Sequence, residues 1–236
     1  MLPNDDSLRE VVFGRNPSGL DGLALGMAPG AVHISMSTIS TSGASELAAE
    51  HARNCQGYVA APVFGNPDAA RARELYIIAA GASVDLERCL PLFNILGQQV
   101  FSVGSEPAAA NLIKIAGNMM TATTLEVLGE VVALLRKGGL NPETFIDILT
   151  ATMFGGRVHR IYGSKIAAQA YAAGFVLPLA LKDVCLALAE AERQAVPMPS
   201  VSVVRDRMLS GIARGYGELD WTALALIAAE DAGLRR

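Results

Sequence analysis

The pattern of apolar residues changes near residue 105, and this change limits the possible fold more than any other feature. Up to about Ser105, short apolar runs that suit strands alternate with amphipathic segments that suit helices. After Glu106 the helical pattern continues without a strong strand candidate. We therefore predict an α/β domain over residues 1–105, followed by an all-helical domain over residues 106–236.

The first domain is predicted to contain a sheet. Four strands are expected at 31–37, 57–63, 75–81 and 99–103, with helices at 43–55 and 85–97. Strands that alternate with helices at this spacing predict a sheet covered by helices on both faces. The glycine-rich segment 18–26 does not follow a strand, and we predict that it is a surface loop.

A long helix is predicted to connect the two domains. It begins at Pro107, a residue favoured in the first helical turn, and ends at Lys137 before two glycines. Asn141 and Pro142 are typical of the start of the next helix. Further helices are expected at 159–172, 179–194, 200–214 and 221–232.

Composition argues against several classes of protein. The chain has 236 residues, of which 51% are hydrophobic and 18% charged, so it can bury a large core. A net charge of −4 argues against a nucleic-acid-binding protein, which would need clustered positive charge. Three separated cysteines, without a CxxC pair, favour neither a disulfide framework nor a zinc site. With an acidic N-terminus and no expected membrane segment or secretion signal, a cytoplasmic location is predicted.

Lys114 is the only charged residue between Pro107 and Leu125, within a strongly apolar helix. Asn111 and Asn118 lie three residues before it and four after it, so the three polar side chains share one helix face. This stripe can aim an amine at a substrate oxygen. Alternatively, the lysine extends its ammonium to solvent at the edge of a groove. The spacing alone leaves both interpretations open.

The segment 109–120, which reads AANLIKIAGNMM, resembles the catalytic helix of the β-hydroxyacid dehydrogenase family. In that family, the lysine is followed four residues later by an asparagine. Four further segments resemble family motifs in the same order along the chain, namely Met1-Leu2-Pro3, Ser37-Thr38-Ile39-Ser40, Ala61-Pro62-Val63 with Gly65, and Gly174-Phe175 with Leu181-Lys182-Asp183.

The resemblance implies a role for each matching residue. Lys114 would be the general acid/base and Asn118 a hydrogen-bond partner of a small-molecule substrate. The cofactor would be NAD or NADP. Substrate contacts would come from Phe64, Gly65 and Asn66, and cofactor contacts from Leu2, Pro3, Ser37, Thr38, Phe175 and Lys182. These residues are expected to converge on one cleft between the domains. Family resemblance also implies a homodimer formed through the helical domain.

Two departures from the family pattern affect this expectation. The family begins with a strand, a GxGxxG turn and a helix that hold the cofactor diphosphate, and no such run exists here. By comparison about 65 residues would be missing, roughly two βαβ units, and we expect weakened cofactor binding and an exposed sheet edge. Phe64-Gly65-Asn66 also replaces the usual Ser-Gly-Gly. This puts carboxylate recognition in doubt and favours a more apolar carbonyl substrate, unless Phe64 only fills the interdomain core.

Three functions therefore remain open. The leading one is NAD(P)-dependent oxidoreduction of a small hydroxy acid or a related carbonyl compound. Imine reduction is a second, although its known enzymes usually carry another residue type at the position of Lys114. A truncated, non-catalytic paralogue that only dimerises is the third. No metal site is predicted, because His33, His51 and His159 lie far apart in the sequence and suit structural or surface roles.

Overall fold

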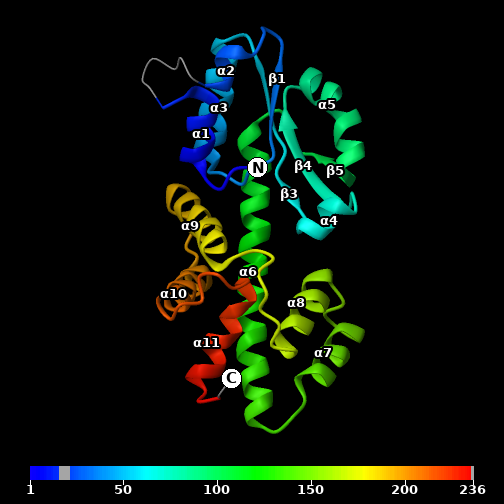
Figure 1. Ribbon diagram of the computed structural model, residues 1–236, viewed down its shortest axis with the longest axis vertical. Coiled ribbons are helices and arrows are strands. Elements are labelled where there is room, and N and C mark those ends of the chain that lie inside the picture. The colour runs from blue at the N-terminus through cyan, green and yellow to red at the C-terminus, as the bar shows by residue number, and fades with distance from the viewer. Residues whose placement is uncertain (16–21, 235–236) are drawn as a thin grey trace. The chain divides into compact units, whose positions relative to one another are not determined.

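The computed structural model describes residues 1–15 and 22–234. These residues form two compact units, Met1–Ala116 and Gly117–Arg236. Helix α6 (Pro107–Lys137) begins in the first unit and continues through the second (Figure 1). Its bounds are those predicted from the sequence. The first unit is a mixed α/β structure and the second is helical, as expected.

The sheet of the first unit contains parallel and antiparallel pairs. Strand β1 (Val32–Ser35) is parallel to β2 (Gly57–Ala60), and β4 (Leu75–Gly81) is parallel to β5 (Gly97–Ser102). Both β2 and β3 (Val63–Phe64) pair antiparallel with β4. Among the described strands, β1, β3 and β5 each pair with one strand only, whereas β2 pairs with two and β4 with three.

The strand predicted at 57–63 is interrupted. Ala61 and Pro62 separate β2 from β3, although both strands pair with β4. A proline has no backbone N–H to donate to a neighbouring strand. Its carbonyl still accepts a hydrogen bond of 2.9 Å from Ile78 N. The interruption therefore turns the chain at this point without releasing it from the sheet.

Helices cover both faces of the sheet, as predicted. Helices α1 (Asp5–Phe13), α2 (Leu23–Gly26) and α3 (Thr41–Arg53) lie on one side in Figure 1, and α5 (Ser83–Leu96) lies on the other. Alternate residues along the chain contribute to the two hydrophobic cores, one on each face of the sheet. Tyr58 and Ala60 pack with α1 and α3, whereas Val59 and Ala61 pack with Phe93 of α5.

Two short helices depart from the predictions. Residues Leu23–Gly26 form α2, so the predicted loop at 18–26 is wrong over this part, while residues 18–21 lie outside the described residues. Helix α4 (Pro67–Arg71) was not predicted. Its start carries a clear local signal, since Asn66 Oδ1 accepts a hydrogen bond from Ala69 N and Pro67 occupies the first turn.

The second unit contains only helices apart from an isolated bridge, Val176–Asp220, within its described residues. This confirms the prediction of an all-helical second half. Helix α8 ends five residues earlier than predicted, at Ala167, where Ala170 N bonds back to Lys165 O. The helices are α7 (Pro142–Ala151), α8 (Arg157–Ala167), α9 (Leu177–Arg193), α10 (Pro199–Ala213) and α11 (Leu224–Asp231), with a 3₁₀ turn at Trp221–Ala223.

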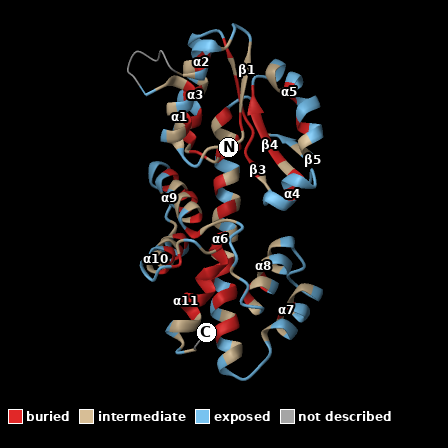
Figure 2. Cartoon of the chain, viewed as in Figure 1, coloured by how far each residue is buried: buried red, intermediate tan, exposed pale blue. Residues whose placement is uncertain are grey.

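Helices α6 and α11 form the centre of this unit (Figure 2). Leu224 to Ala228 are all buried. A Cβ atom on Gly129 of α6 would lie 2.7 Å from Ala225 Cα, so only glycine permits this close approach of the two helices.

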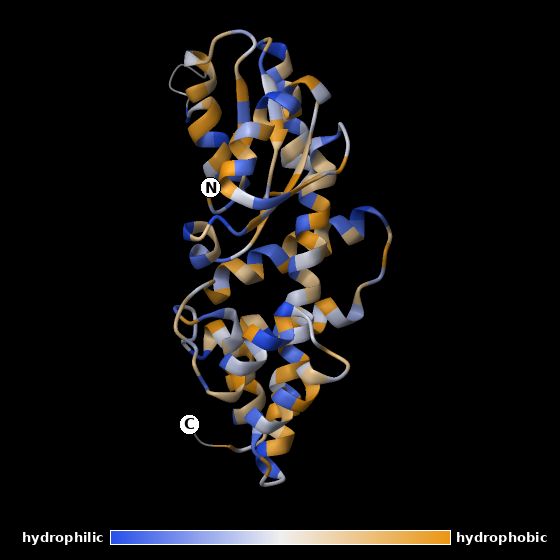
Figure 3. Ribbon diagram, turned by 90° about the vertical axis from the view of Figure 1, so that its right-hand side faces the viewer, coloured by the Kyte–Doolittle hydropathy of each residue, from blue (hydrophilic) through white to orange (hydrophobic). Residues whose placement is uncertain are grey.

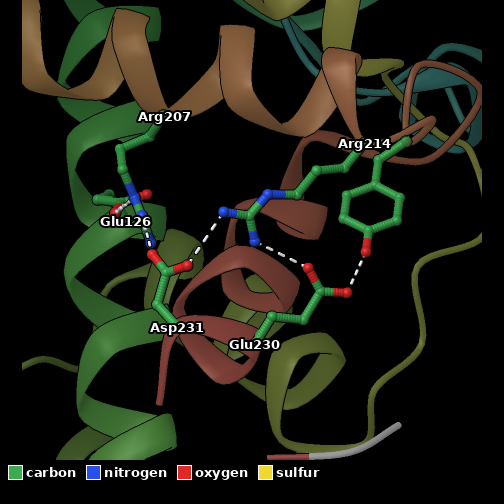
Figure 4. Close-up of polar contacts among 6 residues, drawn as sticks. Glu126, Arg207, Arg214, Glu230 and Asp231 are labelled. Atoms are coloured by element: carbon green, nitrogen blue, oxygen red, sulfur yellow. Dashed lines mark hydrogen bonds and ion pairs between the residues drawn. The ribbon is translucent and has the colours of Figure 1, made fainter. Parts of the chain in front are cut away.

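A network of charged side chains joins α6, α10 and α11 (Figure 4). Arg207 bonds to Glu126 at 2.6 Å and to Asp231 at 2.5 Å, while Arg214 bonds to Glu230 at 2.9 Å and to Asp231 at 3.0 Å. Burial raises the pKa of Glu126, and the nearby Arg207 guanidinium opposes this shift. Because each carboxylate has an arginine partner, the network ties the C-terminal helix to the rest of the unit.

Helix α6 is not buried on all sides, although an apolar composition of this kind is typical of a buried helix. Leu112, Ile113 and Met120 are exposed, while Ile115 and Leu125 are buried. Hydrophobic residues, orange in Figure 3, occur along much of the helix. The helix is also long and apolar enough to cross a membrane by length and composition alone. Its packing at the centre of the helical unit identifies it as a core helix.

Candidate active site

Lys114 and Phe64 meet in the first unit. The ammonium nitrogen of Lys114 lies over the Phe64 ring, 4.4 Å from its centroid. Lys114 comes from the second turn of α6, and Phe64 is the last residue of β3. Both side chains are partly buried. A cation at this distance is attracted to the negative face of an aromatic ring. The contact therefore holds the amine at the end of β3.

The residues after Phe64 form a tight loop. Gly65 has a φ of +141°, and a Cβ atom there would lie 2.7 Å from Leu75 Cδ2, so this position requires glycine. Asn66 is exposed, and its Oδ1 caps α4 by accepting a 2.9 Å bond from Ala69 N. The loop thus presents an aromatic ring to Lys114, while the asparagine carbonyl is engaged in a helix cap.

A second predicted segment of the first unit follows β1. The Leu2 backbone N–H donates to Ser37 Oγ at 2.8 Å, which joins the segment before α1 to the loop after β1. The Ile39 N–H donates to Asn111 Oδ1 at 3.2 Å, which ties the same loop to α6. Pro3 is exposed and Thr38 partly buried. These four residues lie in different parts of the sequence and share no motif, so only the fold brings them together. They are Leu2, Ser37, Ile39 and Asn111.

The second unit places three polar side chains together. Asn118 Nδ2 donates to Asp183 Oδ2 at 2.5 Å, and Lys182 Nζ lies 2.7 Å from Asp183 Oδ1. Asp183 and Asn118 are buried, and Lys182 is partly buried. Asp183 was not among the predicted site residues. The sequence could have indicated Asp183, because it is an acidic residue on the apolar face of α9, directly after Lys182.

Phe175 has a different setting in the second unit. Its ring packs edge-on against Trp221, with 5.1 Å between the ring centroids. Its backbone N–H donates to Asp220 Oδ2 at 3.0 Å, and that carboxylate also accepts from Gly174 N. The predicted cofactor residue Phe175 is therefore held by the core around Trp221, and Asp220 fixes its backbone.

Comparisons with known proteins identify the family of this chain. Residues 1–104 match the family described as the NAD binding domain of 6-phosphogluconate dehydrogenase. Residues 108–228 match the NAD-binding family of NADP-dependent 3-hydroxyisobutyrate dehydrogenase. An uncharacterised oxidoreductase of Bacillus subtilis is 43% identical over 95% of this chain and 77% of its own length. The chain belongs to the β-hydroxyacid dehydrogenase family. It is an NAD(P)-dependent oxidoreductase.

More distant members of the β-hydroxyacid dehydrogenase family extend the comparison. The 2-hydroxy-3-oxopropionate reductase of Escherichia coli is 27% identical over 95% of this chain and 75% of its own length. The solved structure of a 3-hydroxyisobutyrate dehydrogenase from Salmonella typhimurium has a TM-score of 0.85 at 24% identity, covering 95% of this chain and 76% of that one. That structure supports the same fold.

The loop after β1 has features that would suit a nucleotide cofactor. It lies at the carboxyl ends of the parallel strands β1 and β2, where α/β sheets bind nucleotides. Asn111 Nδ2 is a buried donor with no hydrogen-bond partner among the described residues. The diphosphate fits less well here, since the Asp5 carboxylate accepts from Ser40 N at the start of α3 and would repel a phosphate there.

Two other features of the first unit lie outside the predicted site. A cavity of about 160 Å³ is lined mainly by polar residues of α1 and α3, including Asp5, Ser42 and Glu46. His33 Nδ1 and His51 Nε2 share a 2.8 Å hydrogen bond, a contact that the sequence analysis missed. No group of three metal-binding side chains occurs in the described part of the chain.

Proposed function

We propose that this enzyme interconverts a small hydroxy compound and its carbonyl form, with Lys114 as the general acid/base. The observation that carries the proposal is the contact between the Lys114 amine and the Phe64 ring. It holds the only charged side chain in the first half of α6 against the loop that matches the substrate loop of the family. A positioned amine of this kind can exchange a proton with a substrate oxygen.

The reaction divides between the cofactor and the protein. A bound nicotinamide supplies hydride to the carbonyl carbon during reduction, or accepts it during oxidation. Lys114 donates a proton to the oxygen as the carbonyl becomes a hydroxyl, and takes that proton back in the reverse direction. The ring of Phe64 limits where the amine can point, so the proton is delivered from one side.

Asn118 is proposed to bind the substrate oxygen beside Lys114. The two residues are four apart on α6, so their side chains emerge from the same face of the helix. Asp183 accepts a hydrogen bond from Asn118 Nδ2, which fixes the orientation of the amide. Asp183 is therefore a positioning residue, because it acts through Asn118. Gly65 and Asn66 complete the proposed substrate contacts.

The cofactor is proposed to contact two sets of residues. The first set would contact the nicotinamide half and consists of Leu2, Pro3, Ser37 and Thr38. These residues belong to two loops that are joined by the hydrogen bond from Leu2 N to Ser37 Oγ. Phe175 and Lys182 of the helical unit are the second set. Lys182 carries positive charge, although Asp183 partly neutralises it.

Relatives guide the choice of substrate. Those with assigned activities are named as a 2-hydroxy-3-oxopropionate reductase, a 2-(hydroxymethyl)glutarate dehydrogenase and a 3-sulfolactaldehyde reductase. They point to a small hydroxy acid or a related aldehyde for this protein. The three cysteines are free thiols, which suits a cytoplasmic enzyme.

A homodimer through the helical unit is also proposed. Met120, Val127 and Leu134 are 65%, 51% and 72% exposed, and they recur every seven residues along α6. This spacing forms one apolar stripe, which we call the α6 stripe. A second copy of the same stripe would cover it, because two such helices can pack side by side.

An assay with both nucleotides tests the proposed reaction. The purified chain is mixed with NADH or NADPH and a panel of small aldehydes, and oxidation of the nucleotide is followed by its absorbance. We expect reduction of at least one aldehyde that depends on protein concentration, and reversal with the matching alcohol. Failure of every aldehyde with both nucleotides at millimolar concentration would contradict the proposed function.

A further inference from the structure

The Phe64 ring lies directly beside the amine of Lys114. We propose that Phe64 makes this enzyme selective for carbonyl compounds whose nearby substituent is uncharged and apolar, rather than a carboxylate. The inference rests on the proposed function, because it names the substrate class of the site that contains Lys114.

The Phe64 ring presents an apolar surface beside the Lys114 amine. The ring is partly buried and packs against the core formed by α1, α3 and the sheet. Its face already holds the Lys114 ammonium at 4.4 Å. A phenyl ring has no hydrogen-bond donor, and its negatively charged face repels an anion. A carboxylate placed beside the ring would lose water and gain no donor from the ring itself.

The second step concerns the rest of the loop. Gly65 has no side chain, and its conformation and close approach to Leu75 exclude a larger residue with a donor. The Oδ1 atom of Asn66 is engaged in the cap of α4. Helix α4 has only five residues, so its N-terminus offers little charge to an anion. The Nδ2 group of Asn66 can still donate, so the loop supplies one apolar wall and a single side-chain donor at an exposed position.

The third step concerns Lys114 itself. A carboxylate could pair with its ammonium, but that pairing would compete with delivery of the proton to the carbonyl oxygen. An apolar substituent does not compete. It can instead lie along the Phe64 ring and remove further apolar surface from water. The arrangement thus favours the uncharged substituent both by attraction and by the absence of competition.

The test compares two aldehydes of similar shape. Succinic semialdehyde carries a carboxylate, and 4-methylpentanal carries an isopropyl group in its place. We expect kcat/KM to be higher for 4-methylpentanal by about tenfold or more, a discrimination within the range known for apolar pockets. A higher kcat/KM for succinic semialdehyde would overturn the inference while the proposed function stands. Reduction of no aldehyde would instead contradict the proposed function.

Variants separate the apolar wall from other effects. Phe64→Ser adds a hydroxyl and should lower the preference for 4-methylpentanal by about tenfold. Phe64→Leu keeps the wall apolar and should retain the order of preference. Phe101→Ser removes an exposed ring from β5 and is the matched control, with an unchanged preference expected. An unchanged preference in Phe64→Ser, or its loss in Phe64→Leu, would overturn the inference. Melting curves identify any variant that fails to fold, and the wild-type comparison remains decisive in that case.

Discussion

His33 and His51 form a hydrogen-bonded pair within the first unit. His33 Nδ1 and His51 Nε2 are 2.8 Å apart, and His51 Nδ1 lies 2.9 Å from Gln56 Oε1. The Gln56 carbonyl oxygen can only accept, so His51 carries its proton on Nδ1 and His33 donates to His51 Nε2. With one nitrogen donating and the other accepting, the His51 ring is neutral in this arrangement. The pair connects β1 to α3 and the segment before β2.

The histidine pair predicts a loss of stability in mild acid. Burial and the neighbouring His51 lower the pKa of His33 from 6.5 to about 4. The unfolded chain therefore binds more protons between these values, so the contribution is complete above pH 6.5 and is lost as the pH falls toward 4. We expect the melting temperature to fall from pH 7.5 to pH 5. His33→Asn, which can still donate to His51, should show a smaller fall in thermal melts.

A control and a contrary result complete this test. Wild-type protein returned from pH 5 to pH 7.5 should regain its original melting temperature, which excludes irreversible damage. An equal fall in His33→Asn and wild type would assign the acid sensitivity to other groups, such as the carboxylates that pair with Arg207.

For single residues, a local sequence pattern could be recognised from the sequence, but a contact between distant residues could not. Lys114 could be identified from sequence, because a lone charge in an apolar helix is visible locally. Its contact with Phe64 could not, since 50 residues separate the two side chains and only the fold brings them together. The His33–His51 contact was missed for the same reason.

At the scale of elements, the ends of helices were predicted best where a cap or proline marks them. Helices α6 and α7 begin at the predicted prolines. The break at Pro62 was missed, because the apolar run continues through it and the antiparallel partner β4 comes later in the sequence. The antiparallel pairing in the sheet also has no local signal, as strand direction is set by the connections between strands.

The α6 stripe predicts an association that a single charge should disrupt. Val127→Glu places a carboxylate at the centre of the stripe, where a second copy would bury it without a partner. We expect wild type to sediment as a dimer and Val127→Glu to shift toward monomer, with at least a tenfold weaker dimerisation constant. Analytical ultracentrifugation over a range of concentrations measures this shift.

The same substitution elsewhere is the control for the α6 stripe. Val203 of α10 is 55% exposed, close to the 51% of Val127, so Val203→Glu introduces the same charge at similar exposure. It should sediment as wild type. A monomeric wild-type protein, or equal effects of the two substitutions, would contradict a dimer formed through α6.

At the scale of the whole molecule, membership of an NAD(P)-dependent family agrees with the enzyme predicted from the five motifs. It argues against the non-catalytic alternative, because the relatives with assigned activities are named as reductases and dehydrogenases. The substrate was less predictable. The proposed substrate loop departs from the family pattern at Phe64, and a side chain's effect on specificity depends on what it faces in three dimensions.

The central claim is that Lys114 transfers the proton, and steady-state kinetics of its variants test it most directly. With the preferred aldehyde and nucleotide, Lys114→Ala should lower kcat by a factor on the order of 10² to 10⁴. Its melting temperature should change little, because the contact of the Lys114 amine with the Phe64 ring is a cation–π interaction, worth about 0.5–1 kcal/mol at exposed sites. Lys114→Arg should not restore kcat, since guanidinium does not release its proton. Asn118→Ala should lower kcat less, because it removes an orienting hydrogen bond and leaves the amine in place. Near-normal kcat in Lys114→Ala would contradict the account.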